Sequence, residues 1–172
     1  MTKLNAINIL MVADILYILA NYPSPSQDRN NPTSMSDGYT FLITDNGHVY
    51  KGEVTSELYI ELPPEEEGQL SVVRWRASSV DTGVDYQCFI TNIIINKGAE
   101  YLSAPAARQF TATVPVIDGD KYVSSTFVDH VWESHIGAVN NVTLAYHIQF
   151  AIINSQTNSV VGYVQWDPYI DE

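Results

Sequence analysis

The sequence predicts an all-β protein: a single-domain antiparallel β-sandwich of the jelly-roll type, spanning residues 1–172 with about eight or nine strands. The main observation is the alternation between Val142 and Ile152, where every second residue is apolar. This pattern is typical of a strand with one buried face in an antiparallel sheet. Turn-forming groups such as Asp118-Gly119-Asp120 separate the apolar runs, and no stretch has a convincing amphipathic helical pattern.

The first apolar run is the densest in the chain. Its part from Ile7 to Ala13 is short, rich in branched residues and almost continuously apolar, which predicts a central strand buried on both faces. The part from Asp14 to Tyr22 continues the strand or forms a short helix, and the pattern leaves both open. A carboxylate this close to the core needs hydrogen-bond partners. We therefore predict that Asp14 organises the polar segment Asn21–Thr33 through that segment's amides and side chains.

The same run does not fit an export signal or a membrane helix. A signal peptide needs a basic n-region before an uninterrupted apolar core. Here Lys3 is the only early base, and Asn8 and Asp14 interrupt the core. A membrane helix needs about 20 apolar residues with few or no charges. We expect no signal peptide, no membrane partner and a cytoplasmic location.

The other strands follow in order, each bounded by turn residues. Asn46-Gly47 predicts that the first two of them form a hairpin. Ile93–Ile95 is apolar on both sides, so its strand is expected to be central. Arg74 and Arg76 share one strand face and should pair with carboxylates of a neighbouring strand. The expected strands are Tyr39–Asp45, His48–Val54, Glu57–Leu62, Leu70–Arg76, Tyr86–Asn96, Arg108–Val114, Tyr122–Trp132, Val142–Ile152 and Val160–Trp166.

The composition limits the partners. The net charge is −12 with only eight Lys and Arg residues, which argues against nucleic acid and anionic membranes. Charged residues are only 16% of the chain, so many surface positions carry Ser, Thr, Asn, Gln or Tyr. Such a surface can pack against copies of itself, and we expect a homo-oligomer or a higher assembly. The single cysteine, Cys88, excludes an internal disulfide and is expected to be buried and inert.

No pattern in the sequence indicates catalysis. Nucleotide-binding, nucleophile-elbow and zinc-protease motifs are absent. Ser125, Asp129 and His130 are triad residue types, but nothing orders them for proton transfer, and His130 and His135 are poorly spaced for a metal. Acidic and amide-rich turns can bind calcium, although such residues also form turns without a metal. We expect no enzymatic activity, no cofactor and no metal site.

Two motifs at the ends of the chain stand out together. The opening motif runs from Ile7 to Asp14 and continues through Ala20-Asn21-Tyr22-Pro23 and Pro25-Ser26-Gln27-Asp28. The closing motif is Gly162-Tyr-Val-Gln-Trp-Asp-Pro168. Together they resemble the ends of the AidA/PixA family of bacterial inclusion-body proteins, and Tyr39-Thr-Phe41 resembles its second strand.

The resemblance implies a non-enzymatic protein that accumulates in dense or stationary cultures under quorum-sensing or growth-phase control. Some relatives deposit as crystalline cytoplasmic inclusions. The inclusion-forming member is methionine-rich, whereas this chain has only three methionines, so a methionine-storage role is not expected here.

Two functional hypotheses follow. The first is a self-associating structural or storage protein. The second is a lectin-like sandwich that binds carbohydrate, with calcium as a candidate aid, because sugar sites combine aromatic faces with carboxylates and amides. A cleft between Asn21–Thr33 and the Trp166 end would favour binding, and a flat surface would favour assembly. The candidate binding residues are Asp14, Tyr17, Tyr22, Asn30, Asn31, Trp166 and Asp167.

Overall fold

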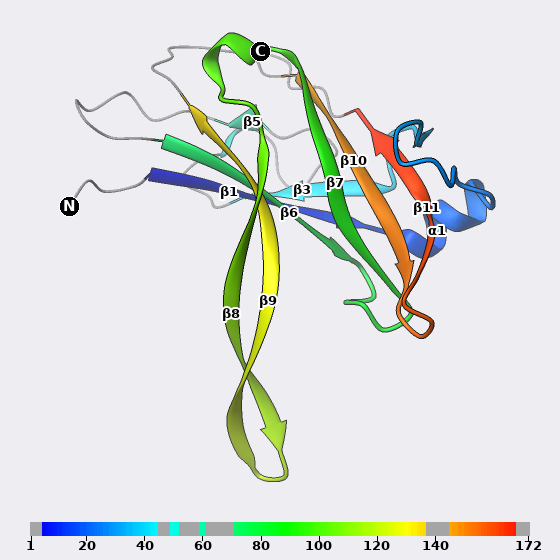
Figure 1. Cartoon of the computed structure of the whole chain (residues 1–172), viewed down its shortest axis with the longest axis vertical. Helices are drawn as coiled ribbons and strands as arrows, with labels where there is room; N and C mark the ends of the chain where they lie inside the picture. The colour runs from blue at the N-terminus through cyan, green and yellow to red at the C-terminus, as the bar shows by residue number, and fades with distance from the viewer. Residues whose placement is uncertain (1–4, 45–48, 52–58, 61–70, 137–144, 168–172) are drawn as a thin grey trace.

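The computed structural model describes residues 5–44, 49–51, 59–60, 71–136 and 145–167. Two β-sheets enclose the apolar core, and one long hairpin projects away from them (Figure 1). The elements are, in chain order, β1 (Asn5–Ala13), α1 (Ile15–Asn21), β2 (Thr33–Ser34), β3 (Thr40–Ile43), β4 (Val49–Lys51), β5 (Tyr59–Ile60), β6 (Ser71–Ser79), β7 (Tyr86–Lys97), the 3-10 helix η1 (Ala99–Tyr101), β8 (Ala106–Asp118), β9 (Lys121–Ile136), β10 (Ala145–Asn154) and β11 (Ser159–Trp166).

The sheets contain both antiparallel and parallel pairs. The first sheet has the order β3-β1-β6-β9-β8, and the second has the order β2-β11-β10-β7. The all-β sandwich is confirmed, but β1 runs parallel to β6, and β11 runs parallel to β2. Alternation in a sequence identifies the buried face of a strand and carries no information about the direction of its neighbour. The purely antiparallel arrangement was therefore wrong.

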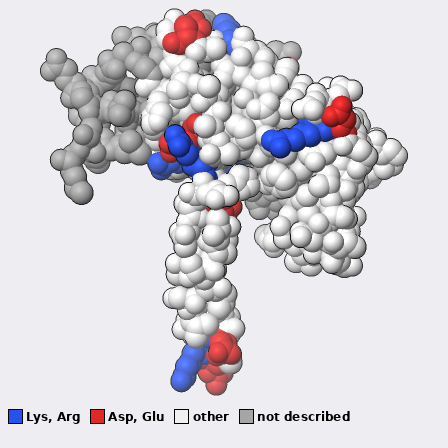
Figure 2. All heavy atoms as spheres, in the orientation of Figure 1, with Lys and Arg blue, Asp and Glu red and all other residues white. Residues whose placement is uncertain are grey.

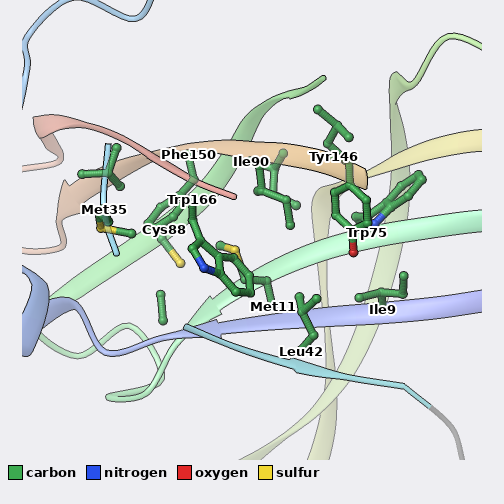
Figure 3. Packing of buried hydrophobic residues seen from close by; sticks show 14 of the residues in the cluster. Ile9, Met11, Met35, Leu42, Trp75, Cys88, Ile90, Tyr146, Phe150 and Trp166 are labelled. Carbon is green, nitrogen blue, oxygen red and sulfur yellow. The ribbon is translucent and has the colours of Figure 1, made fainter. Parts of the chain in front are cut away.

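The core lies between the inner faces of the two sheets (Figure 3). Ile9, Met11 and Leu42 come from the first sheet, and Phe150 and Trp166 from the second; all five are at most 2% exposed. Trp75 and Tyr146 meet across the core edge to face, with ring centroids 5.8 Å apart. Burying each such side chain stabilises the fold by about 1.5–3 kcal/mol relative to exposure.

β1 lies inside its sheet, between β3 and β6, as its apolar sequence predicts. Only one of its faces is in the core, however. Ile7, Ile9, Met11 and Ala13 are buried, whereas Asn8 on the other face is exposed, and Leu10 and Val12 are half-buried. The expectation that both faces are buried was wrong, because the second sheet covers one side of β1.

Asp14 lies between the end of β1 and the start of α1, so the helical alternative for this stretch is the one observed. Its Oδ1 accepts a hydrogen bond of 3.0 Å from the backbone N–H of Tyr17, which makes it the helix N-cap. Ile15 and Ile18, three positions apart, point into the core. The residue is structural, but its partner is the first turn of α1 and not the Asn21–Thr33 segment.

Two predicted strand placements differ from the structure. β7 is the last strand in the order of the second sheet, so it lies at an edge and not in the centre. Its two faces also differ: Ile93 faces the core, and Ile94 points outward and is 37% exposed. β3 pairs with β1, and β4 pairs with β5, so the described pairings contain no β3–β4 hairpin. The turn at Asn46-Gly47, most of Glu57–Leu62 and the acidic loop at 63–68 lie outside the described residues.

Candidate functional site

The aromatic residue at the end of the chain belongs to the core. Trp166 is 0% exposed, and its indole Nε1–H donates a 3.0 Å hydrogen bond to Asp37 Oδ1. Figure 3 shows its ring beside Met11 and Cys88, between the two sheets. No ligand can stack on this ring without unfolding the sandwich, so Trp166 is not a binding residue.

The polar segment after α1 lies flat against β11. Ser26 bridges to Tyr163, and the Gln27 Nε2 amide donates a 2.6 Å hydrogen bond to the Val161 carbonyl. Pro25 packs closely over Gly162: a Cβ added to Gly162 would lie 2.5 Å from Cγ of Pro25. The segment therefore does meet the closing motif, but through close packing that leaves no room for a ligand between them.

The two predicted asparagines of this segment lie in a turn. Asn30 and Asn31 are exposed, and their backbone N–H groups donate to Asp28 Oδ1 and to the Asp28 carbonyl, at 2.9 and 3.1 Å. The Arg29 guanidinium fixes the turn by donating a 2.7 Å hydrogen bond to the carbonyl of Thr91 on β7. The turn thus explains the side chain of Asp28, and it holds Asn30 and Asn31 through their backbone alone.

A tyrosine cluster forms on the surface of α1. The rings of Tyr17 and Tyr22 lie 5.3 and 5.7 Å from the ring of Tyr39, and Tyr17 is 55% exposed. The Tyr22 hydroxyl accepts a 3.2 Å hydrogen bond from the Ser36 N–H and lies 3.5 Å from the Ser36 hydroxyl. These contacts lower the pKa of Tyr22. Of the predicted binding residues, Tyr17 and Tyr22 share this cluster through Tyr39, and Asp14 lies beside them as the acceptor of the Tyr17 N–H.

Asp167 belongs to a hydrogen-bonded ladder on the outer face of the second sheet. Its Oδ1 lies 2.9 Å from His147 Nε2, and His147 Nδ1 lies 3.2 Å from the amide of Gln165. Gln165 accepts from Gln149 at 2.8 Å, and Gln149 accepts from Asn92 at 3.3 Å. The ladder satisfies half-buried amides across three strands. The polar positions that alternate with apolar ones along β10 and β11 could have revealed it.

The second feature that sequence reasoning missed is the projecting hairpin. β9 pairs with β6 only from Trp132 to Ile136. Its pairing with β8 is much longer, from Glu133 opposite Ala106 to Lys121 opposite Asp118. Residues 108–131, here called the arm, therefore form a two-stranded ribbon beyond the sandwich (Figure 1). Isolated two-stranded hairpins are marginally stable in water. An arm of this length gains from a covering surface.

One face of the arm is apolar. Because side chains alternate along a strand and paired residues share a face, the register puts six apolar residues on the same side. The five large ones among them are between 37% and 41% exposed. These residues, here called the apolar face, are Phe110, Ala112, Val114, Val116, Val123 and Phe127. Two polar residues share this side: Ser125 opposite Val114, and Asp129 opposite Phe110 at the base. The predicted alternation through Phe110, Ala112 and Val114 is correct, but no layer of the sandwich covers it.

The opposite face of the arm is mixed. It carries the polar residues Gln109, Thr111, Thr113, Ser124 and Thr126. It also carries Ile117, Tyr122 and Val128, which are 74%, 80% and 68% exposed. The arm ends in a two-residue turn, where Gly119 has φ +61° and Asp118 pairs with Lys121. Figure 2 shows charged residues at the base and at the tip of the arm, with an uncharged stem between them. The stem of the arm thus exposes apolar side chains on both faces, and charge lies only at its ends.

A hollow of about 640 Å³ lies where the apolar face joins the outer face of the first sheet. Three of the chain's four arginines line it: Arg74, Arg76 and Arg108. Arg74 Nε lies 2.9 Å from Glu133 Oε2, and Arg76 pairs with Asp129, which confirms the predicted cross-strand ion pairs. The Arg76 guanidinium also lies 5.9 Å above the ring of Phe110. The three arginines and the two carboxylates that pair with them leave a net charge of +1 at the hollow, on an acidic protein.

The described residues offer little for catalysis. Burial, and secondarily the charge of Asp81, raises the pKa of the Cys88 thiol to about 12, so it is not a nucleophile at neutral pH. Ser125 lies four residues from Asp129 along β9, about 13 Å in an extended strand, so these residues cannot form a triad. No group of three His, Cys, Asp or Glu side chains among the described residues is arranged to hold a metal. None of the helices described is long and apolar enough to cross a membrane.

The fold and surface define a class of protein: an all-β sandwich that presents a projecting hairpin arm with an uncharged stem and packs its closing aromatic motif into the core. The chain belongs to the PixA inclusion body protein family, whose model matches residues 5–171. The family resemblance of the two end motifs is thereby confirmed. No curated protein matches the chain.

A solved structure agrees in fold. The chain is similar to the crystal structure of an inclusion body protein (PixA) from Burkholderia cenocepacia J2315, with a TM-score of 0.78 and 20% sequence identity. The match covers 99% of this chain and 98% of that chain. At this level of identity, the likeness establishes the shared fold alone.

Proposed function

We propose that this chain is a non-enzymatic structural protein that self-associates and accumulates in bacterial inclusions. Membership of the PixA inclusion body protein family supports the proposal. The single structural observation that carries it is the arm, which exposes a row of apolar side chains on a monomer, with Ser125 as the one polar residue of the stem on that side. Monomeric proteins rarely expose large contiguous apolar patches, and those that do usually cover them with a partner.

Charge sets the condition for dense packing. At neutral pH each copy carries a formal charge of −12, and the sequence pI is about 4.5. Copies packed tightly therefore repel one another until carboxylates are protonated or bridged by cations. We propose that deposition occurs in the cytoplasm of dense or stationary cells, where the protein concentration is high enough to offset this repulsion.

The test is sedimentation velocity and light scattering of the full chain from about 1 to 200 μM, between pH 4 and 8, with and without calcium. We expect species larger than a monomer at the upper concentrations, and larger assemblies as the pH approaches the pI. A strictly monomeric protein throughout this range would overturn the proposal. Electron microscopy of stationary-phase cells that express the chain tests the location of the deposits.

A second candidate is carbohydrate binding at the tyrosine cluster. The ring of Tyr17 is more than half exposed and packs on Tyr39, which is the kind of aromatic surface that sugar C–H groups stack on. A glycan array with calcium present tests this candidate. Binding that is lost in Tyr17→Ala would support it, and signals at background would remove it.

A further inference from the structure

We infer that two copies of this chain pair through their arms, which lie antiparallel with their apolar faces in contact and with each acidic tip in the arginine hollow of the other copy. This inference rests on the proposed self-association and adds the surface and geometry by which it occurs. The structural basis is the self-complementary order of residues along the apolar side of β8. In that order the side chains are Arg108, Phe110, Ala112, Val114, Val116 and Asp118.

The order matches itself when one arm is reversed. If a two-fold axis crosses the interface between the arms near residue 113, β8 lies over β8 of the second copy and runs in the opposite direction. Phe110 then faces Val116, and Ala112 faces Val114. Arg108 at the base faces Asp118 at the tip of the other copy. The same axis generates every contact twice.

The charges of the two ends are complementary. The tip carries Asp118 and Asp120 with only Lys121 to balance them. The base carries three arginines, of which Arg74 and Arg76 are paired with Glu133 and Asp129. Residues 109–117 and 122–128 contain no charged side chain, so the stem places no charge in the interface. The apolar face leads into the hollow, because Phe110 belongs to both.

The length of the arm fits this arrangement. Ten residue steps separate Arg108 from Asp118, which gives about 33 Å along an extended strand. The two residues of one copy are therefore too far apart to meet each other, whereas the antiparallel partner brings them together. A two-stranded face of this length is about 10 Å wide, so two such faces bury about 700 Å² in total.

That area alone is too small for a stable dimer. Specific interfaces bury roughly 1,200–2,000 Å² in total. The remainder must come from the two tips inside the two hollows, so the tip contacts are as important as the apolar faces. An interface near the lower limit predicts a dissociation constant on the order of micromolar.

Edge-to-edge pairing of two β8 strands is disfavoured. β8 is the outermost strand of its sheet, and an open edge can in principle add a strand from another copy. Counting from the turn pair Asp118–Lys121, Pro115 and Ser124 form a non-hydrogen-bonded pair, so position 115 faces the open edge. Proline has no N–H to donate there, which blocks the edge at that point. Packing through the apolar face avoids this loss.

The first test places a charge in the centre of the interface. In Val114→Asp, two carboxylates would be buried within the apolar contact, each facing Ala112 of the other copy, and we expect the dimer dissociation constant to rise at least tenfold. The matched control is Thr113→Asp, which adds the same charge on the adjacent residue of the opposite face and should change the constant less than threefold. Circular dichroism of both variants checks that the sandwich stays folded.

The second test uses complementary charge reversals. Arg108→Asp or Asp118→Arg alone turns both tip contacts of the dimer repulsive, and each variant should dimerise at least tenfold more weakly. An equimolar mixture of the two variants restores opposite charges at both contacts and should associate within threefold of the wild type. Such rescue in the mixture requires that residue 108 of one copy meets residue 118 of another.

The outcomes separate the two proposals. A wild-type chain that stays monomeric overturns both the self-association and the arm pairing. A wild-type chain that associates while Val114→Asp behaves like Thr113→Asp overturns the arm pairing alone. Single reversals that dimerise normally, or a mixture that fails to restore association, overturn the antiparallel arrangement with its tip-in-hollow contacts.

Discussion

Replacing Gly162 with Ala tests how firmly the polar segment is bound to β11. A Cβ at this position would lie 2.5 Å from Pro25 Cγ and 2.8 Å from Pro25 Cβ. Carbon atoms pack best at about 3.5–4.0 Å, so either β11 or the segment that contains Pro25 must move by about 1 Å. Both residues are buried, and Ser26 next to Pro25 is hydrogen-bonded to Tyr163, so the movement disturbs several contacts.

The expected cost is about 1–3 kcal/mol, the usual range for inserting a methyl group into a packed site. For a chain of this size each kcal/mol lowers Tm by about 2–4 °C, so Tm should fall by about 2–12 °C. Gly162→Ala should therefore lower the free energy of unfolding, whereas Gly→Ala at a compatible backbone position normally raises it by about 0.4–1 kcal/mol.

Differential scanning calorimetry measures the change, and limited proteolysis at residues 26–31 shows whether the segment has loosened. The control is the double variant Gly162→Ala with Pro25→Gly, in which the ring that clashes is gone. The double variant should lose less stability than the sum of the two single variants. An unchanged Tm in Gly162→Ala, or strict additivity in the double variant, would refute the packing described for this segment.

Further predictions concern single residues. Asp14→Ala removes the N-cap of α1 and should cost about 1 kcal/mol in urea unfolding, whereas Asp14→Asn should cost little. Burial raises the pKa of Tyr146 and Cys88 to about 12, so each stabilises the fold below its ordinary pKa. That stability is lost as pH rises from about 9 to 12, and the loss should be less steep in Cys88→Ala and in Tyr146→Phe. Cys88 should also resist thiol reagents at pH 8 until urea unfolds the chain. Trp166→Phe should lower Tm because Asp37 loses its indole donor.

The sequence predicts much of the fold because alternation is a local property. β10 and β11 occur where the apolar residues alternate, and Tyr146, Ile148 and Phe150 point into the core as expected. The pattern does not specify what covers a face. Val114 in the arm and Ile148 in β10 stand in similar alternating runs, yet Val114 is 37% exposed and Ile148 is fully buried.

The candidate binding site was predicted from residue types, and types alone could not place it. Trp166 and Tyr17 are both aromatic residues near polar segments, but Trp166 closes the core and Tyr17 lies on the surface of α1. Asp14 was expected to bind the following segment because a carboxylate near a core needs donors. The donor observed is the backbone N–H of Tyr17, three residues away in the first turn of α1. The sequence could not identify this donor, because its pattern left the stretch after Asp14 open as strand or helix.

The arm also resolves a difficulty that its charge creates for this protein. Two copies that each carry a net charge of −12 repel strongly when their sandwiches, here called the bodies, touch. Pairing through arms keeps the bodies about 33 Å apart, roughly four Debye lengths at physiological ionic strength. Arm pairing should therefore depend little on pH between 6 and 8, whereas the growth of larger assemblies, which brings bodies together, should increase steeply toward the pI.

This difference separates two steps of assembly that a single turbidity curve would merge. Sedimentation velocity at pH 8 reports the arm-paired dimer, and light scattering between pH 6 and 4 reports growth beyond it. Val114→Asp should lose the first step at pH 8, and near the pI it should form assemblies only at higher protein concentration than Thr113→Asp. A dimer that appears only below about pH 5 would show that body contacts, and not the arms, carry the first step.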